Sequence, residues 1–169
     1  MDLETGLPSY PDKFFDLAIV DPPYGIGRDR EEESTSSHGG RRAYTVKTWD
    51  SQPPPKEYFQ QLFRVSKNQI IWGANYFPQN LIPSMGWILW DKGQRIAQSD
   101  GELAFTSFQK ALRVVTLNRC YIKDHGNGEH PTQKPVKLYR WLLENYAKPG
   151  QLILDTHVGS ASSLIACES

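Results

Sequence analysis

Hydrophobic and polar residues along the chain alternate between two kinds of pattern. Short apolar runs bounded by Pro, Gly or Asp predict buried strands, and apolar residues at helical spacing predict amphipathic helices. Strands are expected at 15–20, 68–72, 86–90, 102–108, 113–117 and 152–154, and helices at 55–66, 136–146 and 161–167. Strands that alternate with helices predict an α/β fold, a three-layer sandwich around a mostly parallel sheet, in a single domain 1–169.

One long segment, 25–55, lacks either periodicity. It contains four glycines, the charge run Arg28–Glu33 and three consecutive prolines at 53–55. A loop of this length in a small domain is typical of a functional or a disordered segment. We therefore predict a mobile loop there.

Composition narrows the function classes. Hydrophobic residues make up 38% of the 169 residues and aromatic residues 12%, which excludes a disordered chain. No apolar run approaches the roughly 18 residues of a membrane span. Two cysteines do not form a disulfide framework, and the acidic N-terminus lacks a signal-peptide pattern, so we expect a cytoplasmic protein without membrane attachment.

The formal net charge is zero, which excludes a polycation that binds nucleic acid through its overall charge. The zero is a cancellation, however. Residues 1–33 hold nine acidic and three basic residues, whereas residues 109–140 hold seven basic and two acidic residues. This distribution fits an acidic active-site segment beside a separate basic contact surface.

The tetrapeptide Asp21-Pro22-Pro23-Tyr24 follows the first predicted strand. Asp21 offers a carboxylate acceptor, and the prolines lack N–H groups, so their turn presents carbonyl acceptors. Tyr24 offers a ring on which a planar heterocycle can stack. Two acceptors beside an aromatic ring suit an exocyclic amine, whose lone pair they would localise for attack. The alternative is a tight turn with a capping Asp.

Two further segments could line a ligand site. The strand–loop–helix at 152–167, with Asp155 and Gly159 in its loop, is typical of a seat for an adenosine-bearing cofactor. On its own it could equally be a plain strand-to-helix turn. The segment His130–Pro135 precedes the helix at 136–146, and it could be either a helix cap or a polar lip of a pocket.

Together these three segments resemble the S-adenosylmethionine-dependent DNA amino-methyltransferases in their permuted (beta-class) motif order. Asp21-Pro22-Pro23-Tyr24 is similar to the catalytic motif of that family, and Asp155–Ser162 is similar to its cofactor loop, D-P-F-x-G-S-G-T. His130–Pro135 resembles the motif before its cofactor-binding helix, and Asp2-Leu3 resembles part of an N-terminal D-C motif. The resemblance implies a Rossmann-like class I methyltransferase core.

The resemblance also implies a reaction. A methyl group would pass from S-adenosylmethionine to the N6 amine of an adenine flipped out of double-stranded DNA. Asp21 and the Pro22 carbonyl would accept from the amine, and Tyr24 would stack on the base. The implied cofactor-binding residues are Asp2, Leu3, Asp21, His130, Pro131, Thr132, Lys134, Asp155, His157, Gly159 and Ser160.

Alternatives remain within and outside this family. Methylation of cytosine N4 uses the same chemistry, but that sub-class more often has Ser at the position of Asp21. The others are RNA adenine methylation, an inactive nucleic-acid-binding relic, and a non-enzymatic nucleotide-binding domain. The cofactor loop departs from the family pattern at Thr156, His157 and Ala161, and by resemblance the chain is expected to end about a strand early.

Basic side chains provide candidate phosphate contacts. We predict DNA contacts at Arg41, Arg42, Lys47, Lys110, Arg113, Arg119 and Lys123. A target-recognition segment is expected at about 109–129, and its shortness suggests limited specificity or help from a second subunit in a homodimer. No metal site is predicted, because Cys120, His125 and His130 lack the second Cys/His pair of a structural zinc site.

Overall fold

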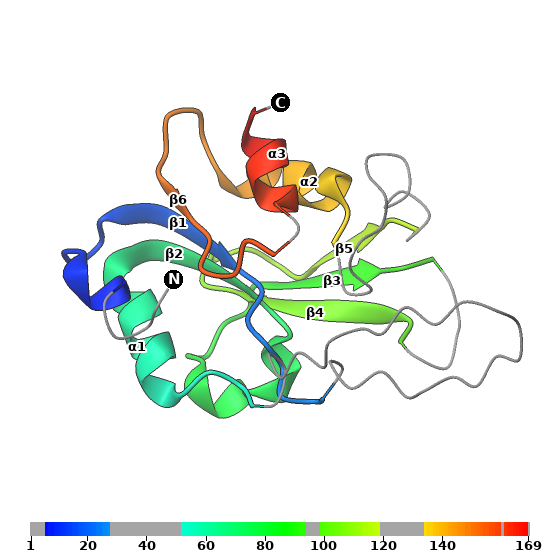
Figure 1. The fold of residues 1–169 in the computed structure, drawn as a ribbon. Helices are drawn as coiled ribbons and strands as arrows, with labels where there is room; N and C mark the ends of the chain where they lie inside the picture. Colours follow the sequence, from blue (N-terminus) through cyan, green and yellow to red (C-terminus); the bar gives the residue numbers. More distant parts are fainter. Residues whose placement is uncertain (1–5, 28–51, 94–98, 119–133, 160, 169) are drawn as a thin grey trace, which may run out of the picture.

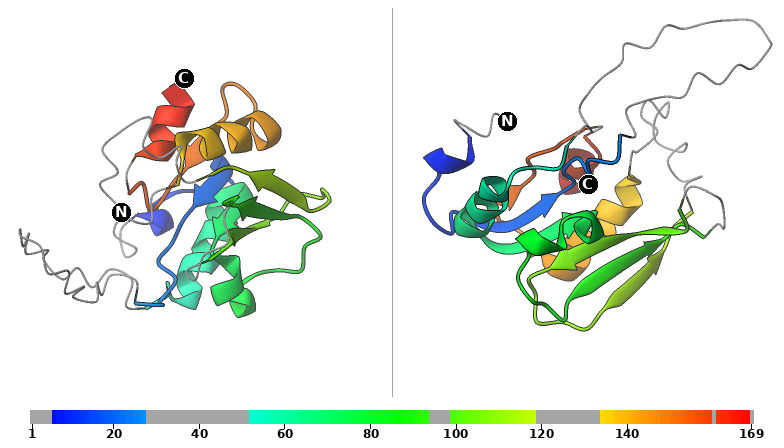
Figure 2. Two further views of the ribbon diagram at one scale, coloured as in Figure 1. Left: turned by 90° about the vertical axis from the view of Figure 1, so that its right-hand side faces the viewer. Right: turned by 90° about the horizontal axis from the view of Figure 1, so that it is seen from below.

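A six-stranded sheet with helices on both faces forms the frame of the protein (Figures 1 and 2). The computed structural model describes residues 6–27, 52–93, 99–118, 134–159 and 161–168. The strands are β1 (Phe15–Val20), β2 (Ser66–Trp72), β3 (Trp87–Asp91), β4 (Gly101–Thr106), β5 (Arg113–Thr116) and β6 (Ile153–Leu154). The α-helices are α1 (Lys56–Val65), α2 (Val136–Tyr146) and α3 (Ser162–Glu168), and the 3-10 helices are η1 (Leu7–Ser9), η2 (Ala74–Tyr76) and η3 (Pro78–Asn80). The predicted α/β fold is confirmed.

The order of the strands is β5-β3-β4-β2-β1-β6. β1 pairs in parallel with β2 and β6, and β3 pairs in parallel with β5, whereas β4 is antiparallel to both of its neighbours. Five strands therefore share one direction, as a mostly parallel sheet requires. The reversal of β4 has a simple cause: the connection from β3 to β4 is shorter than the dozen or so residues that a parallel crossover needs.

Alternate residues of β1 face opposite layers. Leu17 and Ile19 are buried in the core cluster that includes α2 and α3, while Ala18 and Val20 are buried in the cluster that includes α1. Figure 1 shows α2 and α3 on one side of the sheet and α1 on the other. This arrangement confirms the three-layer sandwich and explains why both faces of β1 read as apolar.

The carboxyl ends of the parallel strands lie together at one edge of the sheet. Since β1, β3, β5 and β6 run in the same direction, their carboxyl ends meet there, together with the start of the antiparallel β4. Ligands in such sheets bind outside the carboxyl ends of the strands. We call this the carboxyl edge. Asp21 follows β1 and Asp155 follows β6 on it.

Residues 28–51 of the predicted loop at 25–55, and residues 119–129 of the expected recognition segment, lie outside the described residues. Within the described ranges, no helix combines the length and apolarity needed to cross a lipid bilayer.

Candidate active site

The carboxylate of Asp21 lies on the carboxyl edge, immediately after β1. Its Oδ1 accepts a hydrogen bond from the Tyr24 hydroxyl at 2.7 Å, and its Oδ2 faces the Lys134 ammonium at 2.5 Å. Pro22, which lies between Asp21 and Tyr24 in the chain, is buried. The turn therefore brings the predicted catalytic residues Asp21 and Tyr24 into direct contact. Lys134, from a distant part of the sequence, joins them.

Lys134, just before α2, is buried with only 3% of its side chain exposed. Besides Asp21, its Nζ lies 3.1 Å from Glu102 Oε2 and 3.2 Å from the Tyr24 hydroxyl, and 5.2 Å from the ring centre of Trp72. Burial disfavours the ammonium, but the two carboxylates favour it more, so the pKa of Lys134 is raised. Lys134 therefore stays protonated and supplies a positive charge inside the site.

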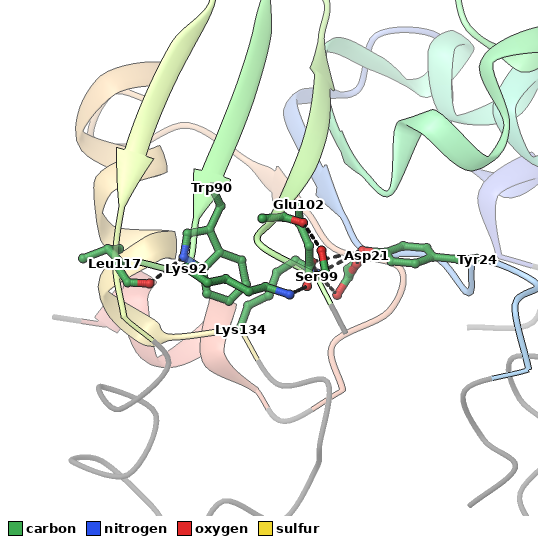
Figure 3. A network of polar contacts seen from close by, with 9 residues as sticks. Asp21, Tyr24, Trp90, Lys92, Ser99, Glu102, Leu117 and Lys134 are labelled. Atoms are coloured by element: carbon green, nitrogen blue, oxygen red, sulfur yellow. Dashed lines mark hydrogen bonds and ion pairs between the residues drawn. The ribbon is translucent and has the colours of Figure 1, made fainter. Parts of the chain in front are cut away.

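A second lysine completes the network. Lys92, 5% exposed and directly after β3, donates to Glu102 Oε1 at 2.8 Å. Burial raises the pKa of Glu102, but the attraction of Lys134 and Lys92 outweighs this and lowers it to about 2. Asp21, Lys134, Glu102 and Lys92 form what we call the ion cluster, two carboxylates alternating with two ammonium groups (Figure 3).

Aromatic rings border the ion cluster. Tyr24 stacks on Tyr76 with ring centres 5.0 Å apart and planes 16° from parallel, and Tyr76 is 41% exposed. Gly73 has a φ of +66°, and a Cβ built on it would overlap the Tyr24 ring. Burial, then the nearby carboxylates, raise the pKa of the Tyr24 hydroxyl, so it stays protonated as a donor to Asp21. The result is a stacked pair of tyrosines with one accessible member.

The loop after β6 is held by Asp155. Its Oδ1 accepts from the backbone N–H of His157 at 2.9 Å, and its Oδ2 accepts from the Ser163 hydroxyl at 2.6 Å. Burial raises the pKa of Asp155. Gly159 and Ala161 have φ values of +53° and +60°, so the loop turns twice through the left-handed region. For Ala161 this conformation is strained, which gives a physical reason why the family pattern has Gly there.

The two unusual residues of this loop are linked to α1. The Thr156 hydroxyl lies 2.7 Å from the Tyr58 hydroxyl and 2.8 Å from His157 Nδ1, so the three side chains form one hydrogen-bonded chain. Burial lowers the pKa of His157 to about 4, against the attraction of Asp21, so the ring is neutral at physiological pH. Polar contacts thus fix a loop that in the family pattern carries Pro and Phe.

The structure brings part of the predicted site together. Within the described residues, Asp21, Pro22, Pro23, Tyr24, Lys134, Asp155, His157 and Gly159 lie along the carboxyl edge. Lys110 and Arg113 do not. Arg113 begins β5, whose start lies at the opposite edge, and Lys110 donates to the carbonyl of Asn145 near the end of α2. The remaining predicted residues, Asp2, Leu3, Arg41, Arg42, Lys47, Arg119, Lys123, His130, Pro131, Thr132 and Ser160, lie outside the described residues.

Sequence reasoning missed four residues of this site: Lys92, Glu102, Tyr58 and Tyr76. Lys92 and Glu102 had a detectable signal, because each is a charged residue directly at the end of an apolar strand. Tyr58 fits the helical spacing of α1, which predicts a core residue, and its ring is indeed buried. Tyr76 carries no local signal, since its role depends on where Tyr24 lies.

Comparisons with known proteins agree with the fold. The crystal structure of the M1.HpyAVI–SAM complex is similar with a TM-score of 0.53 at 17% identity, covering 92% of this chain and 77% of that one. The PvuII DNA methyltransferase, which is cytosine-N4-specific, has a TM-score of 0.55 at 13% identity and covers 96% and 74%. "Putative methylase YubD" of Escherichia coli (strain K12) is 27% identical over 186 residues, which is 94% of this chain and 73% of YubD.

The family assignment comes from the sequence. Residues 69–169, more than half of the chain, match the N6/N4 methyltransferase family model described as DNA methylase. The match takes in Glu102, Lys134 and Asp155, while Asp21 precedes it. The M1.HpyAVI structure is named as a complex with SAM, the S-adenosylmethionine that the sequence resemblance implies for this chain. The chain therefore belongs to the N6/N4 DNA methylase family.

Proposed function

We propose that this DNA methylase transfers a methyl group from S-adenosylmethionine to the N6 amine of adenine in double-stranded DNA. The observation that carries the proposal is the position of two carboxylates on neighbouring parallel strands. Ala18 of β1 pairs with Leu154 of β6, so the turn at Asp21 and the loop at Asp155 leave the same edge side by side. The turn at Asp21 offers acceptors for an amine, and the loop at Asp155 has the form of a cofactor loop.

The residues after β6 fit an adenosine-bearing cofactor. Val158 and Gly159 are exposed, and among the described residues a Cβ on Gly159 would meet only the His157 carbonyl at 3.7 Å, so this part of the structure leaves the outer side of the loop open to a ligand. His157 is neutral, which avoids repulsion of a sulfonium. S-adenosylmethionine supplies an activated methyl group when bound. We propose that Asp155, His157 and Gly159 hold it, with Asp155 acting through the shape of the loop.

Asp21 and Pro22 prepare the nucleophile. The Asp21 carboxylate and the Pro22 carbonyl accept the two hydrogens of the exocyclic amine, which localises the nitrogen lone pair otherwise spread into the ring. With the methyl donor held at the loop after β6, Asp21 and Pro22 would orient the amine nitrogen toward it, and this positioning would account for most of the acceleration. Asp21 is the nearest group to take the proton that the methylated nitrogen releases.

Adenine is proposed over cytosine because position 21 is Asp. By resemblance, the cytosine-N4 sub-class more often carries Ser there. The cytosine-N4 alternative is kept because the PvuII enzyme, named as cytosine-N4-specific, shares the fold. The chain order, with the Asp21 strand first and the Asp155 strand last, supports the permuted arrangement of motifs.

DNA contacts are proposed at the seven basic residues predicted from the sequence. Two of them, Lys110 and Arg113, lie at the edge of the sheet opposite to Asp21. A duplex engaged at Asp21 reaches them only by extending along the β5 side of the sheet, or a second subunit presents them. In the second arrangement the other subunit of the proposed homodimer would supply them. The segment at about 109–129, of which 119–129 lies outside the described residues, is proposed as the target-recognition segment.

The test is methylation of a random double-stranded DNA library with S-adenosylmethionine, read by modified base and by position. The proposal expects N6-methyladenine at a short recurring site. N4-methylcytosine would establish the alternative. An active preparation of a related DNA methylase serves as positive control, so that an unmodified library would refute both.

A further inference from the structure

The acceptor atoms of Asp21 are already engaged by donors of the chain itself. The Tyr24 hydroxyl donates to Oδ1 at 2.7 Å and the Lys134 ammonium lies 2.5 Å from Oδ2 (Figure 3). An exocyclic amine is also a donor, so it competes with them for the lone pairs of the same two oxygens. Lys134 is the stronger competitor, because its bond to Asp21 joins full opposite charges in a buried place.

Lys134 cannot simply leave. Its side chain is 3% exposed, and it approaches the ring of Trp72 on one side. A buried ammonium without a carboxylate partner is strongly disfavoured. Its displacement from Asp21 is therefore possible only if a second acceptor of negative charge lies within reach.

Glu102 is that acceptor. Its Oε2 lies 3.1 Å from Lys134 Nζ, which is hydrogen-bonding distance without any movement of the backbone. Its other oxygen, Oε1, is fixed by Lys92 at 2.8 Å. Glu102 is thus anchored by Lys92 through Oε1 and faces Lys134 through Oε2, which also lies 3.4 Å from the Tyr24 hydroxyl.

We propose that Glu102 is a positioning residue that retains the Lys134 ammonium when the amine of the target base takes the Asp21 carboxylate. This inference rests on the proposed function. Because the four charges of the ion cluster sum to zero, the exchange leaves its net charge unchanged and keeps Lys134 paired with a carboxylate. The amine then binds Asp21 without the cost of an orphaned buried lysine.

The test is a double-mutant cycle with Glu102→Gln and Lys134→Met, measured as kcat and KM for methyl transfer to DNA. Glu102→Gln pins Lys134 to Asp21, so kcat/KM for DNA should fall about tenfold, the size of couplings between contacting residues. On the Lys134→Met background there is no competitor left, and the same substitution should change kcat/KM less than about threefold. Affinity for S-adenosylmethionine should be unchanged by Glu102→Gln.

A second measurement covers variants that turn over too slowly. The Kd for DNA with purine at the target position, which lacks the amine, is divided by the Kd for DNA with adenine. Glu102→Gln should lower this ratio and Lys134→Met should restore it. Glu102→Asp keeps the charge and should fold even if Glu102→Gln does not, with an intermediate ratio because its carboxylate is one methylene shorter.

Equal losses from Glu102→Gln on both backgrounds, or an unchanged Kd ratio, would overturn the role of Glu102 and leave the proposed function standing. A wild-type chain that methylates no DNA would overturn both.

Discussion

Removal of the Lys134 ammonium is the most informative perturbation of the ion cluster. Lys134→Met keeps most of the aliphatic side chain but deletes the charge that Asp21 and Glu102 share at 2.5 and 3.1 Å. Two carboxylates then face each other across a mostly buried space, with Lys92 as the partner of one of them. The expected result is a marked loss of stability.

The magnitude follows from burial. Breaking a buried ion pair by removing one partner costs about 3–5 kcal/mol, and we take about 3 kcal/mol because the Asp21 and Glu102 side chains keep 25% and 19% exposure. For a domain of this size that corresponds to a fall in Tm of roughly 6–12 °C. Circular dichroism during heating at about pH 7 measures it.

The matched control is Lys67→Met. Lys67 is ion-paired with Asp16 at 2.7 Å, but its side chain is 55% exposed, so its charge and that of its partner stay hydrated. Its Tm should hardly change. If Lys134→Met lowered Tm no more than Lys67→Met, the ion cluster would not stabilise the fold, and the reasoning from burial would be refuted.

Acid provides a further check on the same variant. In the wild type the pKa of Glu102 is depressed from 4.5 to about 2, because Lys134 and Lys92 outweigh burial. A depressed carboxyl pKa gives stability that is present above pH 4.5 and is lost as the pH falls toward 2. Lys134→Met removes part of this depression, so the gap in stability between variant and wild type should narrow below pH 4.5. A gap that widened there would contradict the assignment.

Two other perturbations test the neighbouring elements. Gly73→Ala places a Cβ inside the Tyr24 ring, so the rate of methyl transfer should fall at least about tenfold. The control is Gly150→Ala, because Gly150 has a similar positive φ but open space around it, and this variant should keep the wild-type rate. Equal rates for the two variants would contradict the close approach of Gly73 to Tyr24. His157, with a pKa lowered by burial from 6.5 to about 4, takes up its proton more readily unfolded, so stability should fall by up to about 3 kcal/mol as the pH drops through that window. Urea unfolding of His157→Gln should lack this fall, and parallel pH curves for the two proteins would count against a buried neutral ring.

The elements of the fold could be predicted because each has a local cause. The apolar run before Asp21 and the helical spacing at 136–146 both appear where the sequence places them, as β1 and α2. The reversed direction of β4 was not predicted. It depends on the length of the connection and on the pairing with β2 and β3, which are not local properties.

The site shows the same division. Asp21 and Tyr24 are close in the chain, and their contact follows from the turn that the prolines impose. Lys134 was predicted to bind the cofactor. In the structure its ammonium is ion-paired with Asp21 and Glu102. Glu102 and Lys92 come together with it only because β3 ends and β4 begins at the carboxyl edge, which spacing along the sequence does not reveal.

The most direct test of the central claim is tritium transfer from labelled S-adenosylmethionine to DNA by Asp21→Ala. Because Asp21 is the proposed acceptor for the amine, the rate should fall about a hundredfold or more, while the protein stays folded because Glu102 still pairs with Lys134. Asp12→Ala, at a side chain that is 75% exposed, serves as control and should match the wild type. A rate for Asp21→Ala close to that of the wild type would contradict the assignment of the active site.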